Sequence, residues 1–200
     1  MTAPPGSFVT ASAHLTFFRE FLRNPGQIAS VVPSSRFLER RLVEIADVAC
    51  ARLVVELGPG TGGTTRAILR ALAPEARLVA IEINPRFASL LRSVPDARLV
   101  VHTGSAIDIV ETLAHCGLAR PDVVLSGIPF STMPSGIGDR ILRAAWLALA
   151  PGGRFVAYQF RASVATLGRK ILGTPEVALE LRNAPPMRVY RWRKPVVVDG

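Results

Sequence analysis

A short apolar run ends in an acid and then opens into closely spaced glycines, in the segment Val54-Val55-Glu56-Leu57-Gly58-Pro59-Gly60-Thr61-Gly62. The apolar run is typical of a buried strand, and a helical pattern follows over residues 64–72. Glycine in such a turn permits positive φ angles and a close approach of the backbone to a ligand, while the helix behind it offers unpaired N–H groups. We therefore predict a nucleotide-type cofactor loop. Its candidate binding residues are Glu56, Gly58, Gly60, Thr61 and Gly62.

Downstream of this loop, apolar β-type runs alternate with helical patterns. The expected strands cover residues 52–57, 77–83, 97–102, 122–126 and 154–160. The expected helices cover residues 63–73, 85–93, 106–116, 136–149 and 162–172. This alternation predicts an α/β fold with a doubly wound parallel sheet. Two further runs, 177–181 and 187–192, are joined by a connection too short for a helical crossover, so we expect them to pair antiparallel.

The composition fits one domain over residues 1–200, which we divide into an N-terminal helical segment, 1–50, and a core, 51–200. The 49% hydrophobic content is ample for one core. A net charge of +9 favours an anionic partner, with nucleic acid, a phospholipid surface and an acidic protein all open. Cys50 and Cys116 lack the spacing of a metal site, so we expect no metal, and they fit a reducing cytoplasm. Because we find neither a secretory signal nor an apolar run that could span a bilayer, any membrane contact should be peripheral.

Residues 1–50 stand outside the alternation of strands and helices. An apolar helical face is formed by Leu15, Phe17, Phe18, Phe21 and Leu22, and Arg19 and Arg23 lie among the residues of the opposite face. This helix either packs on its own domain or lies in a membrane interface, with Phe17, Phe18 and Phe21 among the lipid headgroups and Arg19 and Arg23 on their phosphates. A second helix, over residues 37–48, should begin after Ser34 and Ser35, which suit an N-cap.

A second acid belongs to the candidate cofactor site. Glu82, followed by Ile83, ends the second expected strand, about twenty residues past the glycines, where a carboxylate can accept hydrogen bonds from both ribose hydroxyls. Three features together resemble the motifs of class I methyltransferases: the E-x-G-x-G-x-G loop, this acid, and a Pro151-Gly152-Gly153 turn before the fifth strand. The resemblance implies a seven-stranded Rossmann-like sheet ending in an antiparallel hairpin. It also implies S-adenosylmethionine as the cofactor, with S-adenosylhomocysteine as its product, and places Ser105 and Ala106 at the adenine, where Ser105 replaces a common Asp.

The loop after the fourth strand, Ser126-Gly127-Ile128-Pro129-Phe130, should lie beside the transferred methyl group. It is similar to the N-L-P-Y loop of rRNA adenine dimethylases, whose Asn holds an exocyclic amine and whose aromatic ring stacks on the base. Aligned on the proline, Gly127 replaces the Asn and Phe130 the Tyr. Glycine has no side-chain acceptor for an exocyclic amine, which weakens this interpretation. A nucleic-acid methyltransferase is therefore kept as the alternative function. We expect no nucleic-acid partner.

Several short stretches resemble the bacterial phospholipid N-methyltransferases of the rhizobial type. They are the amphipathic start with residues 27–35, the 126–130 loop with Met133-Pro134, and residues 183–190. The resemblance implies stepwise methylation of phosphatidylethanolamine to phosphatidylcholine by an enzyme bound peripherally to an anionic membrane, at the cytoplasmic face of the cell membrane. A related branch methylates ornithine lipids, and the sequence does not separate the two substrates.

The remaining candidates concern the substrate and the membrane. The 126–130 loop supplies Gly127, Ile128, Pro129 and Phe130 as substrate-binding residues, and Ser126 as both a catalytic and a cofactor-binding residue. Arg188 and Tyr190 are expected to hold the lipid phosphate, Tyr158 to stabilise an ammonium by a cation–π contact, and Trp192 to act as an interfacial anchor. Tyr190 is also a weak candidate for the catalytic base. The motifs contain no His/Asp pair, so the proton acceptor stays open. The oligomeric state also stays open. A small-molecule methyltransferase and a binding module without catalysis remain alternative functions.

Overall fold

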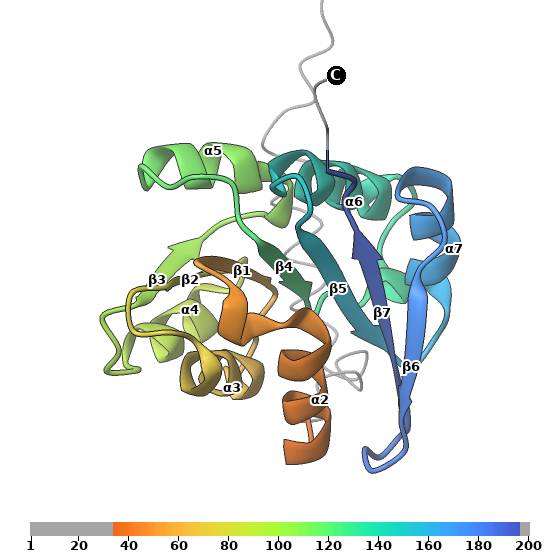
Figure 1. Ribbon diagram of the computed structural model, residues 1–200, viewed down its shortest axis with the longest axis horizontal. Helices are drawn as coiled ribbons and strands as arrows, with labels where there is room; N and C mark the ends of the chain where they lie inside the picture. Colours follow the sequence, from red (N-terminus) through yellow and green to blue (C-terminus); the bar gives the residue numbers. More distant parts are fainter. Residues whose placement is uncertain (1–33, 197–200) are drawn as a thin grey trace, which may run out of the picture. The chain divides into compact units, whose positions relative to one another are not determined.

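A computed structural model describes residues 34–196, which form a seven-stranded sheet with helices on both faces (Figure 1). The strands are β1 (Leu53–Leu57), β2 (Arg77–Glu82), β3 (Leu99–Thr103), β4 (Val123–Ser126), β5 (Arg154–Gln159), β6 (Glu176–Glu180) and β7 (Met187–Arg193). The α-helices are α2 (Arg36–Ala46), α3 (Gly63–Ala71), α4 (Pro85–Arg92), α5 (Ile109–His115), α6 (Ile137–Ala148) and α7 (Ser163–Ile171). Short 3₁₀ turns are η2 (Val48–Cys50), η3 (Ala106–Asp108) and η4 (Phe130–Thr132).

The strand order is β3-β2-β1-β4-β5-β7-β6. Strands β1 to β5 pair in parallel, whereas β7 pairs antiparallel with both β5 and β6. The predicted Rossmann-like sheet with its C-terminal hairpin is therefore confirmed. Two expected helices differ. The helix predicted over 37–48 ends at Ala46, where Asp47 adopts the left-handed conformation, and the 3₁₀ turn η2 follows. The helix predicted over 106–116 begins as the 3₁₀ turn η3, which the Ser105 hydroxyl caps, and continues as α5.

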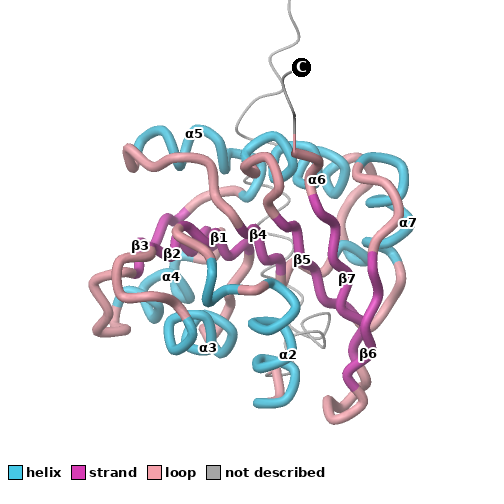
Figure 2. Tube along the Cα trace, in the orientation of Figure 1, coloured by secondary structure: helices cyan, strands magenta, loops and turns pink. Residues whose placement is uncertain are grey.

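The sheet is buried on both faces, as a parallel sheet requires. Helices α5, α6 and α7 pack on one face, on side chains such as Val55, Leu57 and Phe155. Helices α2 and α3 pack on the other face, on neighbours such as Val54 and Val156. Figure 2 shows the strands lying between these two groups of helices. No helix in residues 34–196 is both long and apolar enough to cross a membrane.

Helix α2 begins where the sequence predicts a cap. The Ser35 hydroxyl accepts a hydrogen bond from the Leu38 N–H at 3.2 Å, which satisfies one of the free N–H groups of the first turn. Leu38, Leu42 and Ala46 recur every four residues and are fully buried. The amphipathic helix predicted around Phe17, Phe18, Phe21, Arg19 and Arg23 lies outside the described residues, so its membrane role stays a prediction.

Candidate active site

The loops that follow the parallel strands meet at one edge of the sheet, where the carboxyl ends of the strands lie. Backbone hydrogen bonds hold them together: the Gly58 N–H donates to the Ile81 carbonyl at 3.0 Å, and the Gly127 N–H donates to the Leu57 carbonyl at 2.9 Å. The Gly104 N–H donates to the carbonyl of Glu82 at 3.0 Å. The segments that the sequence singled out are thus brought to the carboxyl edge of the sheet.

The glycine loop has the backbone geometry of a ligand cradle. Gly58, Gly60 and Gly62 have φ angles of +69°, +57° and +83°, a region that other residues rarely adopt. A Cβ atom at Gly58 would lie 2.9 Å from Cγ1 of Ile128, so the loop approaches the neighbouring β4 loop closely. Gly62 is the N-cap of α3, so the free N–H groups of that helix begin directly behind the loop.

Glu82 is fixed by two backbone donors. One carboxylate oxygen accepts from the Gly60 N–H at 2.9 Å and the other from the Asn84 N–H at 2.8 Å, and the residue is 5% exposed. Burial raises the pKa of its carboxyl, and these hydrogen bonds oppose that shift. Each oxygen retains one lone pair for a ligand hydroxyl. The carboxylate therefore fits the role predicted for it, binding of two ribose hydroxyls, which stays a prediction.

Glu56 lies beneath the glycine loop and points toward α3. Its carboxyl accepts a hydrogen bond from the Thr65 hydroxyl at 2.6 Å, and the residue is 1% exposed. Burial raises its pKa to about 8, which the Thr65 hydrogen bond opposes. The side chain therefore supports the loop from below, and Thr65 is a partner that the sequence analysis missed.

The residues predicted at the adenine lie after β3. The Ser105 hydroxyl accepts from the Ile107 N–H at 3.2 Å, so it is engaged in capping η3. Ala106 is buried, and Ile83, beside Glu82, is 39% exposed. These residues present backbone groups and an apolar side chain at the carboxyl edge.

Gly127 faces a tyrosine hydroxyl. A Cβ atom at residue 127 would lie 2.8 Å from the Tyr158 hydroxyl and 3.0 Å from the Gly58 carbonyl oxygen. The Tyr158 hydroxyl also lies 3.4 Å from the Thr64 hydroxyl, at the start of α3. An Asn at 127, as in the dimethylase loop, would collide with Tyr158. Two oxygen atoms thus border the position that the Asn side chain would occupy.

Gln159 is a functional candidate that the sequence analysis missed. It ends β5, is 6% exposed, and its side-chain amide donates to the Ile128 carbonyl at 2.7 Å. Its buried Oε1 atom has no hydrogen-bond partner among the described residues, and such an atom normally has one. The signal was present in the sequence, since a polar residue ends an apolar strand next to Tyr158.

The structure corrects three other predicted roles in this region. Ser126 is fully buried, and its hydroxyl accepts from the Ile128 N–H at 3.3 Å, so it shapes the loop instead of facing a substrate. Phe130 is 4% exposed and packs in the core against Gly138, so its ring does not stack on a ligand. Ile128, at 8% exposed, is also largely buried, whereas Pro129 is partly exposed.

The roles predicted for two aromatic residues of β7 are also corrected. Tyr190 and Trp192 are each 2% exposed, and their ring centroids lie 6.0 Å apart. The Trp192 indole N–H donates to the Gly173 carbonyl at 2.8 Å. They face inward because β7 is not an edge strand and α7 covers them. Tyr190 therefore does not hold a phosphate or take a proton from the substrate. Trp192 does not act as a membrane anchor. Arg188 is exposed and donates to the Phe160 carbonyl at 2.9 Å; its phosphate role stays a prediction.

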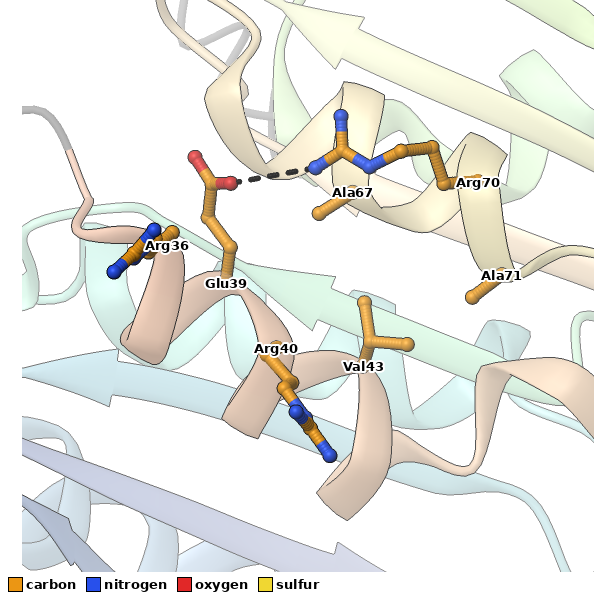
Figure 3. Close-up of a pocket in the computed structure, with 7 residues that line it drawn as sticks. All are labelled: Arg36, Glu39, Arg40, Val43, Ala67, Arg70 and Ala71. Carbon is orange, nitrogen blue, oxygen red and sulfur yellow. Dashed lines mark ion pairs between the residues drawn. The ribbon is translucent and has the colours of Figure 1, made fainter.

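A groove of about 220 Å³ lies between α2 and α3, apart from the predicted site residues. Arg36 and Arg40 border it from α2 and Arg70 from α3, and Glu39 forms an ion pair with Arg70 at 3.5 Å (Figure 3). Among the described residues, no group of three or more His, Cys, Asp or Glu side chains is placed to hold a metal ion.

Comparison with solved structures shows the same fold. The chain is similar to the 1,6-didemethyltoxoflavin-N1-methyltransferase of Burkholderia thailandensis, with a TM-score of 0.67, 18% identity, and coverage of 98% of this chain and 93% of that one. It is also similar to the precorrin-6y C5,15-methyltransferase of Geobacter metallireducens, with a TM-score of 0.63, 16% identity, and coverage of 78% and 87%. No protein-family model matches this chain.

Comparison with characterised relatives is more specific. The chain is 33% identical to the ornithine lipid N-methyltransferase of Singulisphaera acidiphila over 180 residues, which cover 88% of this chain and 94% of the relative. It is 34% identical to the ribosomal RNA small subunit methyltransferase A of Phenylobacterium zucineum over 124 residues, which cover 58% of this chain and 42% of that relative.

This protein is a class I methyltransferase, of the kind that depends on S-adenosylmethionine. Within that class, the Singulisphaera ornithine lipid enzyme is a relative that the chain matches over nearly its full length. The predicted enzyme class and its cofactor are confirmed at this level.

Proposed function

We propose that this chain transfers methyl groups from S-adenosylmethionine to the amine of a membrane aminolipid, and that ornithine lipid is its substrate. The observation that carries the proposal is the match along 94% of the Singulisphaera ornithine lipid enzyme. The match favours ornithine lipid, which the sequence analysis kept as an alternative substrate. It does not favour phosphatidylethanolamine, the substrate that the sequence analysis inferred first. The number of methyl groups transferred follows from the assay below.

The rRNA enzymes match less of this chain, and Gly127 lacks the side chain that the resemblance to them implies. The alignment covers 42% of the Phenylobacterium enzyme. At residue 127, the glycine offers no side-chain acceptor, and the Tyr158 hydroxyl and the Gly58 carbonyl leave no room for one. These two observations favour an amine at the end of a flexible lipid headgroup over an adenine held by an Asn.

S-Adenosylmethionine supplies an electrophilic methyl group on a positively charged sulfur. The glycine loop and Glu82 are the residues that would hold it. A Cβ atom at Gly60 would meet no protein atom within 4 Å, and the Gly60 N–H fixes one oxygen of the Glu82 carboxylate. Transfer forms a carbon–nitrogen bond and breaks a carbon–sulfur bond in one in-line step, so alignment of the amine supplies most of the rate.

We assign alignment of the amine to oxygen atoms that lie near Gly127. The Tyr158 hydroxyl and the Gly58 carbonyl lie close to Gly127, and Gln159 carries a buried acceptor that has no partner among the described residues. Burial raises the pKa of Tyr158, so its hydroxyl is neutral at neutral pH and serves as a hydrogen-bond partner instead of a base. We propose that these groups orient the nitrogen lone pair toward the methyl group.

The proposal is tested with labelled S-adenosylmethionine and three separate acceptors: ornithine lipid in detergent micelles, phosphatidylethanolamine in the same detergent, and small-subunit rRNA. We expect label in ornithine lipid, and its loss in Glu82→Ala. Label confined to phosphatidylethanolamine would replace the substrate, and label confined to rRNA would overturn the lipid assignment. Cytoplasmic location at the inner membrane face is part of the proposal, and fractionation of cells expressing the tagged protein tests it.

A further inference from the structure

Three large apolar side chains are exposed where β5 and β6 end. Phe160 is 54% exposed, Leu179 49% and Leu181 68%. Because β5 and β6 both pair antiparallel with β7, they run in the same direction and end at the same edge of the sheet as the glycine loop. On the other face of β6, Glu180 is 4% exposed, so the strand turns its leucines outward and its acid inward.

These side chains lie on segments that are neighbours in the fold. Leu179 lies opposite Arg188 in the β6–β7 ladder, and Arg188 donates to the Phe160 carbonyl at 2.9 Å. On the α2 side, the Ser35 N–H donates to the Asn183 side chain at 2.9 Å. We call the segments 34–38, 160–162 and 179–188 the hairpin rim. Figure 2 shows the loop between β6 and β7 at the end of this hairpin.

The hairpin rim is basic. It contains Arg36, Arg161, Arg182 and Arg188, and the one acid within it, Glu180, is buried and paired with Arg182 at 3.1 Å. The Arg182 guanidinium also lies 4.5 Å above the ring of Phe37, which ties the hairpin loop to α2. A surface that mixes exposed apolar side chains with arginines in excess over acids is complementary to an anionic lipid bilayer, which accepts the apolar groups and pairs the cations with phosphates.

We propose that the hairpin rim docks this enzyme on an anionic bilayer; the proposal rests on the lipid substrate proposed above. The rim adjoins the candidate active site, because Gln159 directly precedes Phe160 and binds the Ile128 carbonyl of the β4 loop. Docking by the rim brings the carboxyl edge of the sheet to the headgroups, so a lipid amine reaches Gly127 and Tyr158 while its acyl chains stay in the bilayer.

The test is binding of the full chain to vesicles of phosphatidylglycerol and phosphatidylcholine, which contain no aminolipid and so report docking without catalysis. The double variant Phe160→Ser/Leu181→Ser removes exposed apolar groups, and Arg161→Gln removes an exposed cation. The matched controls are Leu147→Ser, at a 62% exposed residue near the end of α6, and Arg77→Gln, at the start of β2 on the opposite edge of the sheet.

We expect the double variant to lower the vesicle partition coefficient about tenfold or more and Arg161→Gln about fivefold, with both controls at the parental value. Parental binding by the rim variants would overturn the proposal. So would a loss of self-association in the double variant without a loss of vesicle binding, because the rim would then be a contact between copies.

Methyl transfer in detergent micelles separates this proposal from the proposed function. Rim variants that methylate micellar ornithine lipid at the parental rate, yet do so slowly in vesicles, support docking by the rim. If the parent methylates no lipid in micelles but its vesicle binding still depends on the rim, the substrate assignment fails and the docking surface stands.

Discussion

The two halves of the carboxyl edge differ in what they present. After β1 and β2, the edge presents the backbone of glycines with positive φ angles. Beside them lies one side chain, the carboxylate of Glu82, which two backbone N–H groups hold in place. After β5 and β6, the edge presents side chains, with exposed apolar groups beside arginines. The half after β1 and β2 is suited to one polar ligand in one geometry. The half after β5 and β6 is suited to the surface of a lipid bilayer.

The largest expected effect tests whether the β7 aromatics belong to the core. Trp192→Ala should lower the free energy of unfolding by about 3–5 kcal/mol, because it leaves a cavity next to Phe155, whose ring centroid is 5.7 Å away. Urea denaturation measures this loss, with Leu147→Ala as the exposed control. A loss of vesicle binding at parental stability would instead restore Trp192 as a membrane anchor.

Glu82 tests the ligand half. Glu82→Ala should weaken S-adenosylhomocysteine binding by about 2–4 kcal/mol, because it removes an acceptor that is charged and held in place. Isothermal titration calorimetry measures the affinity, and Glu75→Ala, at an exposed acid before β2, is the matched control. Parental affinity in Glu82→Ala would contradict the cofactor site.

A substitution at Gly127 tests the close contact between this residue and the Tyr158 hydroxyl. Gly127→Ala should raise the barrier to methyl transfer by about 1–3 kcal/mol, because the new methyl group meets the Tyr158 hydroxyl. In the Tyr158→Phe background the added methyl group should cost less, since the hydroxyl is gone. Equal costs in both backgrounds would show that Tyr158 does not border this space.

Gln159 tests whether the buried acceptor serves the substrate. Gln159→Leu should raise the KM for lipid amine, an effect worth about 1–2 kcal/mol. It should also lower the free energy of unfolding, because it removes the buried hydrogen bond to the Ile128 carbonyl at 2.7 Å. Initial rates in micelles and urea denaturation give the two values. Lower stability with an unchanged KM would assign Gln159 to the fold alone.

Glu56 is tested through the pH dependence of stability, where its effect is spread over several pH units. Burial raises the pKa of Glu56 to about 8 from an ordinary 4.5, so between these values the unfolded chain releases a proton that the folded chain keeps. The free energy of unfolding should therefore fall as pH rises, by about 1.4 kcal/mol per pH unit from this group. Below this window both states are protonated, and above it the loss is complete. Glu56→Gln should remove the slope in urea titrations, whereas Glu111→Gln, at an exposed acid, should keep it.

The glycine half could be predicted from the sequence because its geometry is local. Positive φ angles favour glycine, and an acid at the end of the next parallel strand lies at the same edge, so Gly60 and Glu82 could be predicted from their spacing. The contact between Gly127 and Tyr158 could not be predicted, since it joins residues far apart in the sequence whose side-chain directions depend on packing.

The hairpin half was harder to predict because alternation along a strand does not say which face is covered. Tyr190 and Trp192 share a face with Arg188, and only the position of α7 decides that the aromatics are buried while the arginine is exposed. The exposed Leu179 and Leu181 follow from the same register, since α7 does not cover the end of β6.

The most direct test of the proposed substrate is a competition between two lipids in one membrane. Vesicles containing equal amounts of ornithine lipid and phosphatidylethanolamine are incubated with the enzyme and S-adenosylmethionine, and mass spectrometry counts the methyl groups added to each lipid. We expect methylated ornithine lipid to dominate the products. Methylated phosphatidylethanolamine as the dominant product, or no methylated lipid at all, would contradict the account.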